Sequence, residues 1–134
     1  MDKLGCLRRV AIFSLLDDAA LSRLAEISTD FDARAGQTLI EADAPGSGMF
    51  VLETGTVLVE AHERTAELGP GEYFGERALL TDDGRRTARV RAKTDVRCLA
   101  ISREDFADLL RAEPKLAVEI LEGVATQHTG HLQT

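Results

Sequence analysis

Residues 73–87, with the sequence YFGERALLTDDGRRT, are the most informative stretch of this chain. A Gly-Glu step opens a short apolar run with helical character, a polar loop follows, and an Arg-Thr pair closes the segment. The N-terminus of a helical turn offers free backbone N–H groups, and a guanidinium can bind two phosphate oxygens at once. The stretch therefore predicts a site for one small anion.

Short apolar or alternating runs surround this stretch, and Gly, Pro and Asp interrupt them throughout residues 31–101. The alternation predicts strands at 37–41, 49–53, 56–61, 65–68, 88–93 and 96–101. Turn signals lie at 44–48, 53–55, 69–71 and 82–84. Strands this closely spaced, without a long helix between them, predict a small antiparallel barrel or roll.

Helical periodicity is found at both ends of the chain. Residues 4–28 are predicted to be helical, with Asp17 as an N-cap. Ser102 is placed to cap a second helical region, and Pro114 fits the first turn of the last helix. The last helix has an apolar stripe at 3.6-residue spacing, formed by Leu116, Ala117, Ile120, Leu121 and Val124. The pattern predicts an α+β fold in one domain, residues 1–134, with helices at 4–28, a β-roll at 31–101 and helices at 103–128.

The stretch 73–87 resembles the phosphate-binding cassette of the cyclic nucleotide-binding domain family. Flanking segments resemble successive turns of that family's β-roll in the same order, so that the resemblance covers nearly the whole chain: 36–40, 49–52, 55–57, 68–76, 86–94 and 98–101. The resemblance implies a double-stranded β-helix, or jelly-roll-like, β-roll between the helices. It also implies a regulatory module that binds cAMP or cGMP and has no catalytic activity of its own.

The resemblance assigns a role to each residue of the cassette. Gly75 permits close backbone approach and a positive φ before the helical turn. The family's Glu, here Glu76, accepts a hydrogen bond from the ribose 2′-hydroxyl, and its Arg, here Arg86, neutralises the cyclic phosphate. Backbone N–H groups that bind the exocyclic phosphate oxygens are expected from Arg77, Ala78 and Leu79. Arg85 is adjacent to Arg86, but a strand directs neighbours to opposite faces, so only one of them enters the pocket.

The choice of base depends on fewer residues. Thr87 offers a hydroxyl to a phosphate oxygen and, for a base in the syn conformation, to the guanine 2-amino group. In the kinase branch of the family an Arg on the preceding strand can read guanine, and Ala66 occupies the comparable place here. Thr65 and Ala66 are the candidate base contacts, and either nucleotide is compatible with this set. Bacterial regulators of the family cover the base with a Thr-Ser pair, where this chain has His131 and Leu132.

Composition and charge argue against nucleic-acid binding, membrane insertion and a disulfide scaffold. A net charge of −7 argues against sequence-independent nucleic-acid binding, and the basic side chains of Arg89, Arg91 and Lys93 are expected on a solvated outer strand face. No apolar run approaches the roughly 20 residues that span a bilayer, so membrane insertion is not expected. The two cysteines, Cys6 and Cys98, favour a reduced cytoplasmic protein over a disulfide scaffold.

Catalytic and metal sites have little support in the sequence. His128 and His131 have a metal-compatible spacing but lie in the C-terminal tail, and a chance surface pair is favoured. We therefore expect no metal, no cofactor and no direct nucleic-acid partner. Two classes of function stay open: a cyclic-nucleotide sensor that acts on a protein effector, or a ligand-independent interaction module. A homodimer through the last helix is compatible with both, and the regulatory half of a separate effector is a third reading.

Overall fold

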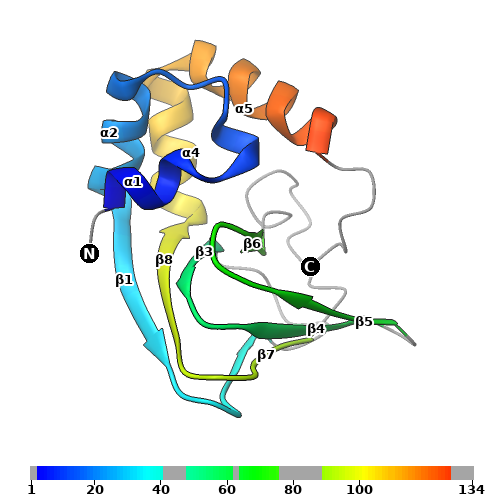
Figure 1. Ribbon diagram of the computed structural model, residues 1–134. Coiled ribbons are helices and arrows are strands. Elements are labelled where there is room, and N and C mark those ends of the chain that lie inside the picture. The colour runs from blue at the N-terminus through cyan, green and yellow to red at the C-terminus, as the bar shows by residue number, and fades with distance from the viewer. Residues whose placement is uncertain (1–2, 41–47, 62–63, 76–88, 128–134) are drawn as a thin grey trace.

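The computed structural model describes residues 3–40, 48–61, 64–75 and 89–127. Figure 1 shows helices packed together at one end of the molecule, above strands that curve away from them. The helical elements are α1 (Lys3–Arg8), the 3-10 turn η1 (Ala11–Phe13), α2 (Asp18–Ile27), α4 (Arg103–Ala112) and α5 (Pro114–Gln127). The strands are β1 (Ser28–Ala33), β2 (Thr38–Ile40), β3 (Gly48–Thr54), β4 (Val57–Ala61), β5 (Arg64–Leu68), β6 (Tyr73–Phe74), β7 (Arg89–Ala92) and β8 (Val96–Ser102).

The described strands form two four-stranded sheets whose pairs are all antiparallel. The first sheet has the order β1-β8-β3-β6, and the second has the order β2-β7-β4-β5. Consecutive strands therefore alternate between the sheets in places, as they do in a roll. The α+β fold and the antiparallel roll between terminal helices are confirmed.

Alternating side chains fill the space between the two sheets. Val57 and Val59 of β4, Leu68 of β5 and Val90 of β7 are all buried there, opposite Leu52 and Cys98 from the first sheet. Phe74 is fully buried and stacks on Phe50 with ring centroids 5.1 Å apart, while Phe31 meets Phe50 edge-on at 5.3 Å. We call this side of each sheet the inner face.

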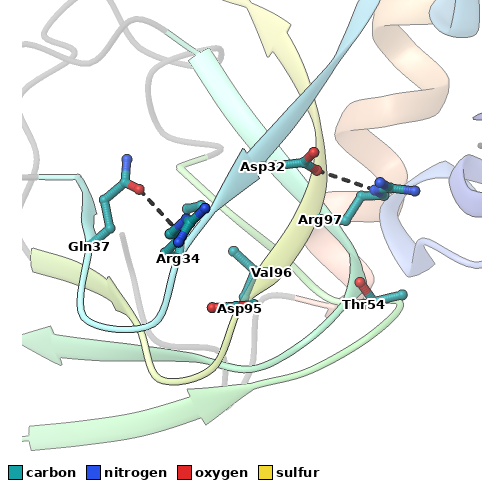
Figure 2. Close-up of a pocket in the computed structure, with 8 residues that line it drawn as sticks. Asp32, Arg34, Gln37, Thr54, Asp95, Val96 and Arg97 are labelled. Carbon is teal, nitrogen blue, oxygen red and sulfur yellow. Dashed lines mark hydrogen bonds and ion pairs between the residues drawn. The ribbon is translucent and has the colours of Figure 1, made fainter.

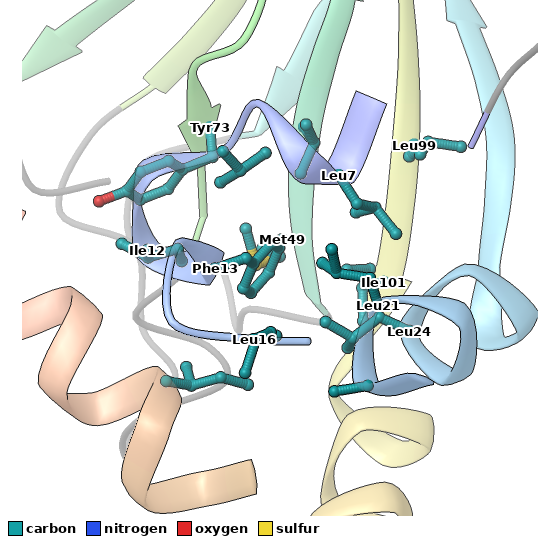
Figure 3. Packing of buried hydrophobic residues seen from close by; sticks show 14 of the residues in the cluster. Leu7, Ile12, Phe13, Leu16, Leu21, Leu24, Met49, Tyr73, Leu99 and Ile101 are labelled. Atoms are coloured by element: carbon teal, nitrogen blue, oxygen red, sulfur yellow. The ribbon is translucent and has the colours of Figure 1, made fainter. Parts of the chain in front are cut away.

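A second hydrophobic cluster joins the outer side of the first sheet to the helices. Figure 3 shows Phe13 against Met49, with Leu7, Leu21 and Ile101 around them. Burial of each such side chain contributes roughly 1.5–3 kcal/mol. Tyr73 of β6 belongs to this cluster, so the strand that leads into segment 76–88 is tied to the helical layer.

The helix starts follow the sequence prediction. The Asp17 carboxylate accepts a hydrogen bond from the Ala20 N–H at 2.8 Å, and the Ser102 hydroxyl accepts one from the Asp105 N–H at 3.1 Å. Each bond satisfies a donor that the first helical turn leaves without an intrahelical partner. Pro114 begins α5, where its missing N–H removes no helical bond.

Three features differ from the sequence prediction. The region 4–28 is divided into α1, η1 and α2, and the chain is already in a strand at Ser28. β1 and β6 had not been predicted: β1 carries Asp30 and Asp32, which are uncommon in strands, and β6 has only two residues. Gly48, predicted as the last residue of a turn at 44–48, instead begins β3. The other residues of that turn, and the predicted turn at 82–84, lie outside the described residues.

Candidate functional site

Gly75 is the one cassette residue with a predicted ligand-binding role that lies within the described part of the chain. It follows β6, whose Tyr73 and Phe74 pair with Val51 and Phe50, and it is buried with a φ of 83°. A residue with a side chain rarely adopts this φ, so the prediction of a positive φ at Gly75 is confirmed. The other cassette residues with predicted ligand contacts lie outside the described residues: Glu76, Arg77, Ala78, Leu79, Arg86 and Thr87.

The two ends of segment 76–88 are attached to different sheets. Gly75 leaves β6 at an edge of the first sheet, and Arg89 begins β7 inside the second sheet, where it pairs with Glu60 of β4. Segment 76–88 therefore connects the edge of the first sheet to an inner strand of the second.

The two candidate base contacts lie on opposite faces of the β4–β5 hairpin. Ala66 lies opposite the buried Val59, and residues directly opposite in an antiparallel pair share a face, so Ala66 is on the inner face. Thr65 lies opposite Glu60 and is exposed on the outer face. The alternation also assigns Arg64 to the inner face, two residues from Ala66.

The basic residues of β7 and the adjoining Lys93 lie on the outer face, as the sequence predicted. Arg89 and Lys93 are exposed, while Val90 and Ala92 are buried on the inner face. Glu60 binds Arg91 at 3.0 and 3.4 Å, and Glu67 pairs with Lys93. Carboxylates from β4 and β5 thus offset part of this positive charge, which fits a solvated face.

A polar cavity of about 580 Å³ lies at the opposite end of β7 from segment 76–88. Figure 2 shows Asp32 and Arg97 turned toward each other, with Asp95, Thr54 and Arg34 from neighbouring turns. The Arg97 Nε donates to Asp32 at 3.2 Å, and Asp95 accepts from the Ala35 N–H at 2.9 Å. The first bond links β1 to β8, and the second links the β1–β2 turn to the β7–β8 turn.

The two cysteines, Cys6 and Cys98, are both buried and carry free thiols. Cys98 is fully buried in the roll, and burial, with a smaller contribution from Asp32, raises the pKa of its thiol to about 12. A thiol in that state is a poor nucleophile. Cys6 belongs to the helix-side cluster on the other face of the first sheet.

Metal-binding clusters of His, Cys, Asp or Glu are absent from the described residues. All three histidines lie outside those residues: His62, His128 and His131. Among the described helices, none combines the length and the apolar character that a membrane crossing needs.

Comparison with known proteins identifies the class. A family model described as "Cyclic nucleotide-binding domain" matches residues 31–113, which include the whole segment 76–88. The chain belongs to the cyclic nucleotide-binding domain family. This membership confirms the resemblance carried by residues 73–87 and their flanking strands.

The curated relatives that match this chain are larger proteins. The chain is 38% identical over 117 residues to Glutaminase 2 of Bradyrhizobium diazoefficiens, covering 86% of this chain and 18% of the relative. It is 38% identical to a cAMP-dependent protein kinase regulatory subunit of Aspergillus fumigatus, covering 78% and 26%. A cyclic nucleotide-gated potassium channel of Mesorhizobium japonicum is 34% identical, covering 90% and 33%. The chain thus spans a third or less of these three relatives.

Solved structures of similar length share the fold. The N-terminal domain of a transcriptional regulator from Streptomyces coelicolor A3(2) aligns with a TM-score of 0.79 at 32% identity, covering 95% of this chain and 90% of that one. A second structure, described with a cyclic-GMP-dependent signalling pathway that regulates bacterial phytopathogenesis, has a TM-score of 0.75 at 30% identity, covering 89% and 98%.

Proposed function

We propose that this domain binds a 3′,5′-cyclic nucleotide, cAMP or cGMP, and acts as a regulatory module without catalysis of its own. The observation that carries the proposal is the buried, positive-φ Gly75 directly before Glu76, inside the region that the family model matches. Two relatives are named for responses to cyclic nucleotides, a cAMP-dependent kinase regulatory subunit and a cyclic nucleotide-gated channel.

Each proposed contact has a chemical reason. Arg86 binds two phosphate oxygens through its planar guanidinium, and the N–H groups of Arg77, Ala78 and Leu79 bind the others. The Glu76 carboxylate accepts a hydrogen bond from the ribose 2′-hydroxyl. The Thr87 hydroxyl is a hydrogen-bonding group for the phosphate and the base. Arg86 is proposed over Arg85 because the family register, counted back from Ala88, Arg89 and Val90, selects it.

The proposed output passes through the helical layer. Tyr73, two residues before Gly75, packs in the same cluster as Phe13 of η1 and as Leu116 and Ile120 of α5. In this proposal, bound ligand draws segment 76–88 inward and thereby favours one packing arrangement of the cluster. The position of α5, and so the surface that an effector protein contacts, changes with that arrangement.

A second copy of the chain is a proposed partner through α5. The supporting observation is Val118, a large apolar side chain on α5 that is 55% exposed. Light scattering of the wild type and of Val118→Asp tests this contact: a dimer that the variant dissociates supports it, and a monomeric wild type at high concentration contradicts it.

The binding proposal is tested by isothermal titration of the wild type with cAMP, cGMP and 5′-AMP. We expect either cyclic nucleotide to bind, and 5′-AMP, whose open phosphate has a different shape and charge, to bind much more weakly. A 2′-deoxy cyclic nucleotide removes the partner of Glu76 and should lose roughly 1–3 kcal/mol. Absence of binding by both cyclic nucleotides would favour the ligand-independent interaction module, and equal affinity for the 2′-deoxy ligand would remove Glu76 from the site.

A further inference from the structure

β1 is an edge strand of the first sheet. It pairs with β8 on one side through six consecutive residue pairs without a bulge, and none of the strands that the structure describes pairs with its other side. Figure 1 shows β1 at the margin of the molecule, beside β8. Six residues in a strand span about 20 Å. This open edge is therefore long enough to pair with an extended segment of another molecule.

The hydrogen bonds of the sheet determine which backbone groups of β1 point outward. The N–H and the carbonyl of Leu52 in β3 both bond the turn that precedes β6. In an antiparallel sheet, successive residues turn these groups to alternate neighbours, so Val51 turns to its partner Leu99 of β8. The next residue of β8, Cys98, then turns to its partner Phe31 of β1.

Asp30 and Asp32 consequently turn their N–H and carbonyl groups away from β8. Ser28 follows the same alternation, because its N–H bonds the Ala25 carbonyl at the end of α2 and its carbonyl accepts a hydrogen bond from Lys3 Nζ at 2.8 Å. Among the described residues, none bonds the outward backbone groups of the two aspartates. Two donors and two acceptors are thus available along the edge.

The side chains along the edge determine which kind of strand fits it. Asp30 is exposed on the outer face opposite the apolar Leu99, and it has no ion pair with any residue that the structure describes. Asp32, on the same face, pairs with Arg97. A second copy of β1 would bring four carboxylates together, whereas Lys or Arg at alternate positions complements them. Between the aspartates, Phe31 is half-buried on the inner face and offers an apolar contact.

We propose that the open edge of β1 binds an extended, basic segment of a partner protein as an added antiparallel strand. The residues opposite Asp30 and Asp32 are Lys or Arg, and the residue between them is apolar and covers Phe31. Backbone hydrogen bonds to the two aspartates hold the segment, and the Asp30 carboxylate selects its charge. The edge lies outside the proposed nucleotide site, so either proposal can fail alone.

Fluorescence anisotropy with labelled eight-residue peptides tests the pairing. A peptide of alternating Lys and Val should bind at least about tenfold more tightly than one of alternating Glu and Val, or one with its Lys and Val in two blocks. N-methylation of the central Lys residues removes N–H groups that face β1 and should weaken binding at least about tenfold. N-methylation of the central Val residues removes N–H groups that face away and should change affinity less than about threefold.

Variants of the protein test whether the peptide binds at β1. Asp30→Ala removes the carboxylate and should weaken the Lys-Val peptide about three- to tenfold. Asp30→Pro also removes the outward N–H, which the open side of an edge strand tolerates, and should weaken it at least about threefold more. Glu67→Gln is the matched charge control, because Glu67 is an exposed carboxylate on β5, an edge strand of the other sheet, and should leave the affinity unchanged.

Three results would overturn the proposal. The first is no binding of the Lys-Val peptide at about 1 mM, or equal effects of the two methylation patterns. The second is wild-type affinity in Asp30→Pro, whose fold thermal unfolding checks. The third is a wild-type dimer that Asp30→Pro dissociates, since the edge would then pair with a second copy of the chain. If Asp30→Pro does not fold, the methylated peptides and Asp30→Ala decide.

Discussion

Gly55 and Gly36 have nearly the same backbone conformation in very different surroundings. Their φ values are 90° and 89°, a region that L side chains rarely adopt. A Cβ on Gly55 would lie 2.3 Å from the Asp95 carbonyl oxygen and 2.7 Å from Val96, whereas a Cβ on Gly36 would meet nothing within 4 Å. The β3–β4 turn therefore needs glycine for two reasons, and the β1–β2 turn needs it for one.

Alanine at these two positions should separate strain from close contact. Gly36→Ala is expected to lower the free energy of unfolding by about 1–2 kcal/mol through backbone strain alone. Gly55→Ala adds a clash with backbone that has little freedom to move, so we expect a loss of roughly 2–5 kcal/mol. Urea denaturation measures both, and equal losses in the two variants would show that the clash relaxes.

Single residues were predictable from sequence where one local rule decides. The caps at Asp17 and Ser102 and the positive φ of Gly75 follow from residue type and neighbours alone. Thr65 and Arg64 were not assigned to faces, because the face depends on the register of β5 against β4 and on which side of that hairpin is buried.

At the scale of elements, α2 shows how a short helix is defined. Its ten residues begin after Asp17, whose carboxylate accepts a hydrogen bond from the Ala20 N–H. The helix buries the side chains of Ala20, Leu21 and Leu24. A helix of this length is marginal in isolation, so the cap and the buried side together hold it.

Asp17→Ala should lower the free energy of unfolding by about 1 kcal/mol, because the first turn loses a partner for one N–H. Asp17→Asn keeps an acceptor oxygen at the same place and should stay within a few tenths of a kcal/mol of the wild type. Thermal or urea unfolding distinguishes them. A loss as large in Asp17→Asn as in Asp17→Ala would assign the effect to charge rather than to the hydrogen bond.

Elements with strong periodicity were predicted well, and those defined by long-range pairing were not. The six predicted strands all overlap observed ones, since each carries its own alternation. β1 has alternating Asp residues and becomes a strand by pairing with β8, about 70 residues later in the chain, as Ser28 with Ile101 and Ala33 with Val96. β6 pairs only Tyr73 and Phe74 with β3. Such pairings are invisible to a local pattern.

At the scale of the whole molecule, segment 76–88 links three parts. It is attached to the first sheet at Gly75 and to the second at Arg89, and Tyr73 ties its entry to the helical layer. The sequence predicted the existence of the roll and of the cassette, but the order of strands in the sheets depends on the fold as a whole. These attachments support the proposal that ligand bound at the segment affects both sheets and, through the Tyr73 cluster, α5.

The central claim is that Arg86 holds the phosphate of a cyclic nucleotide, and neighbouring arginines offer the most direct test. Isothermal titration should be performed on the wild type, Arg86→Ala and Arg85→Ala with the tighter-binding of cAMP and cGMP. Both variants lose one positive charge from the same segment, so a general electrostatic effect would change them alike. We predict that Arg86→Ala loses roughly 2–5 kcal/mol of binding free energy, as for a charge left without its partner, while Arg85→Ala binds nearly as the wild type does. Wild-type affinity in Arg86→Ala, or the larger loss in Arg85→Ala, would contradict the account.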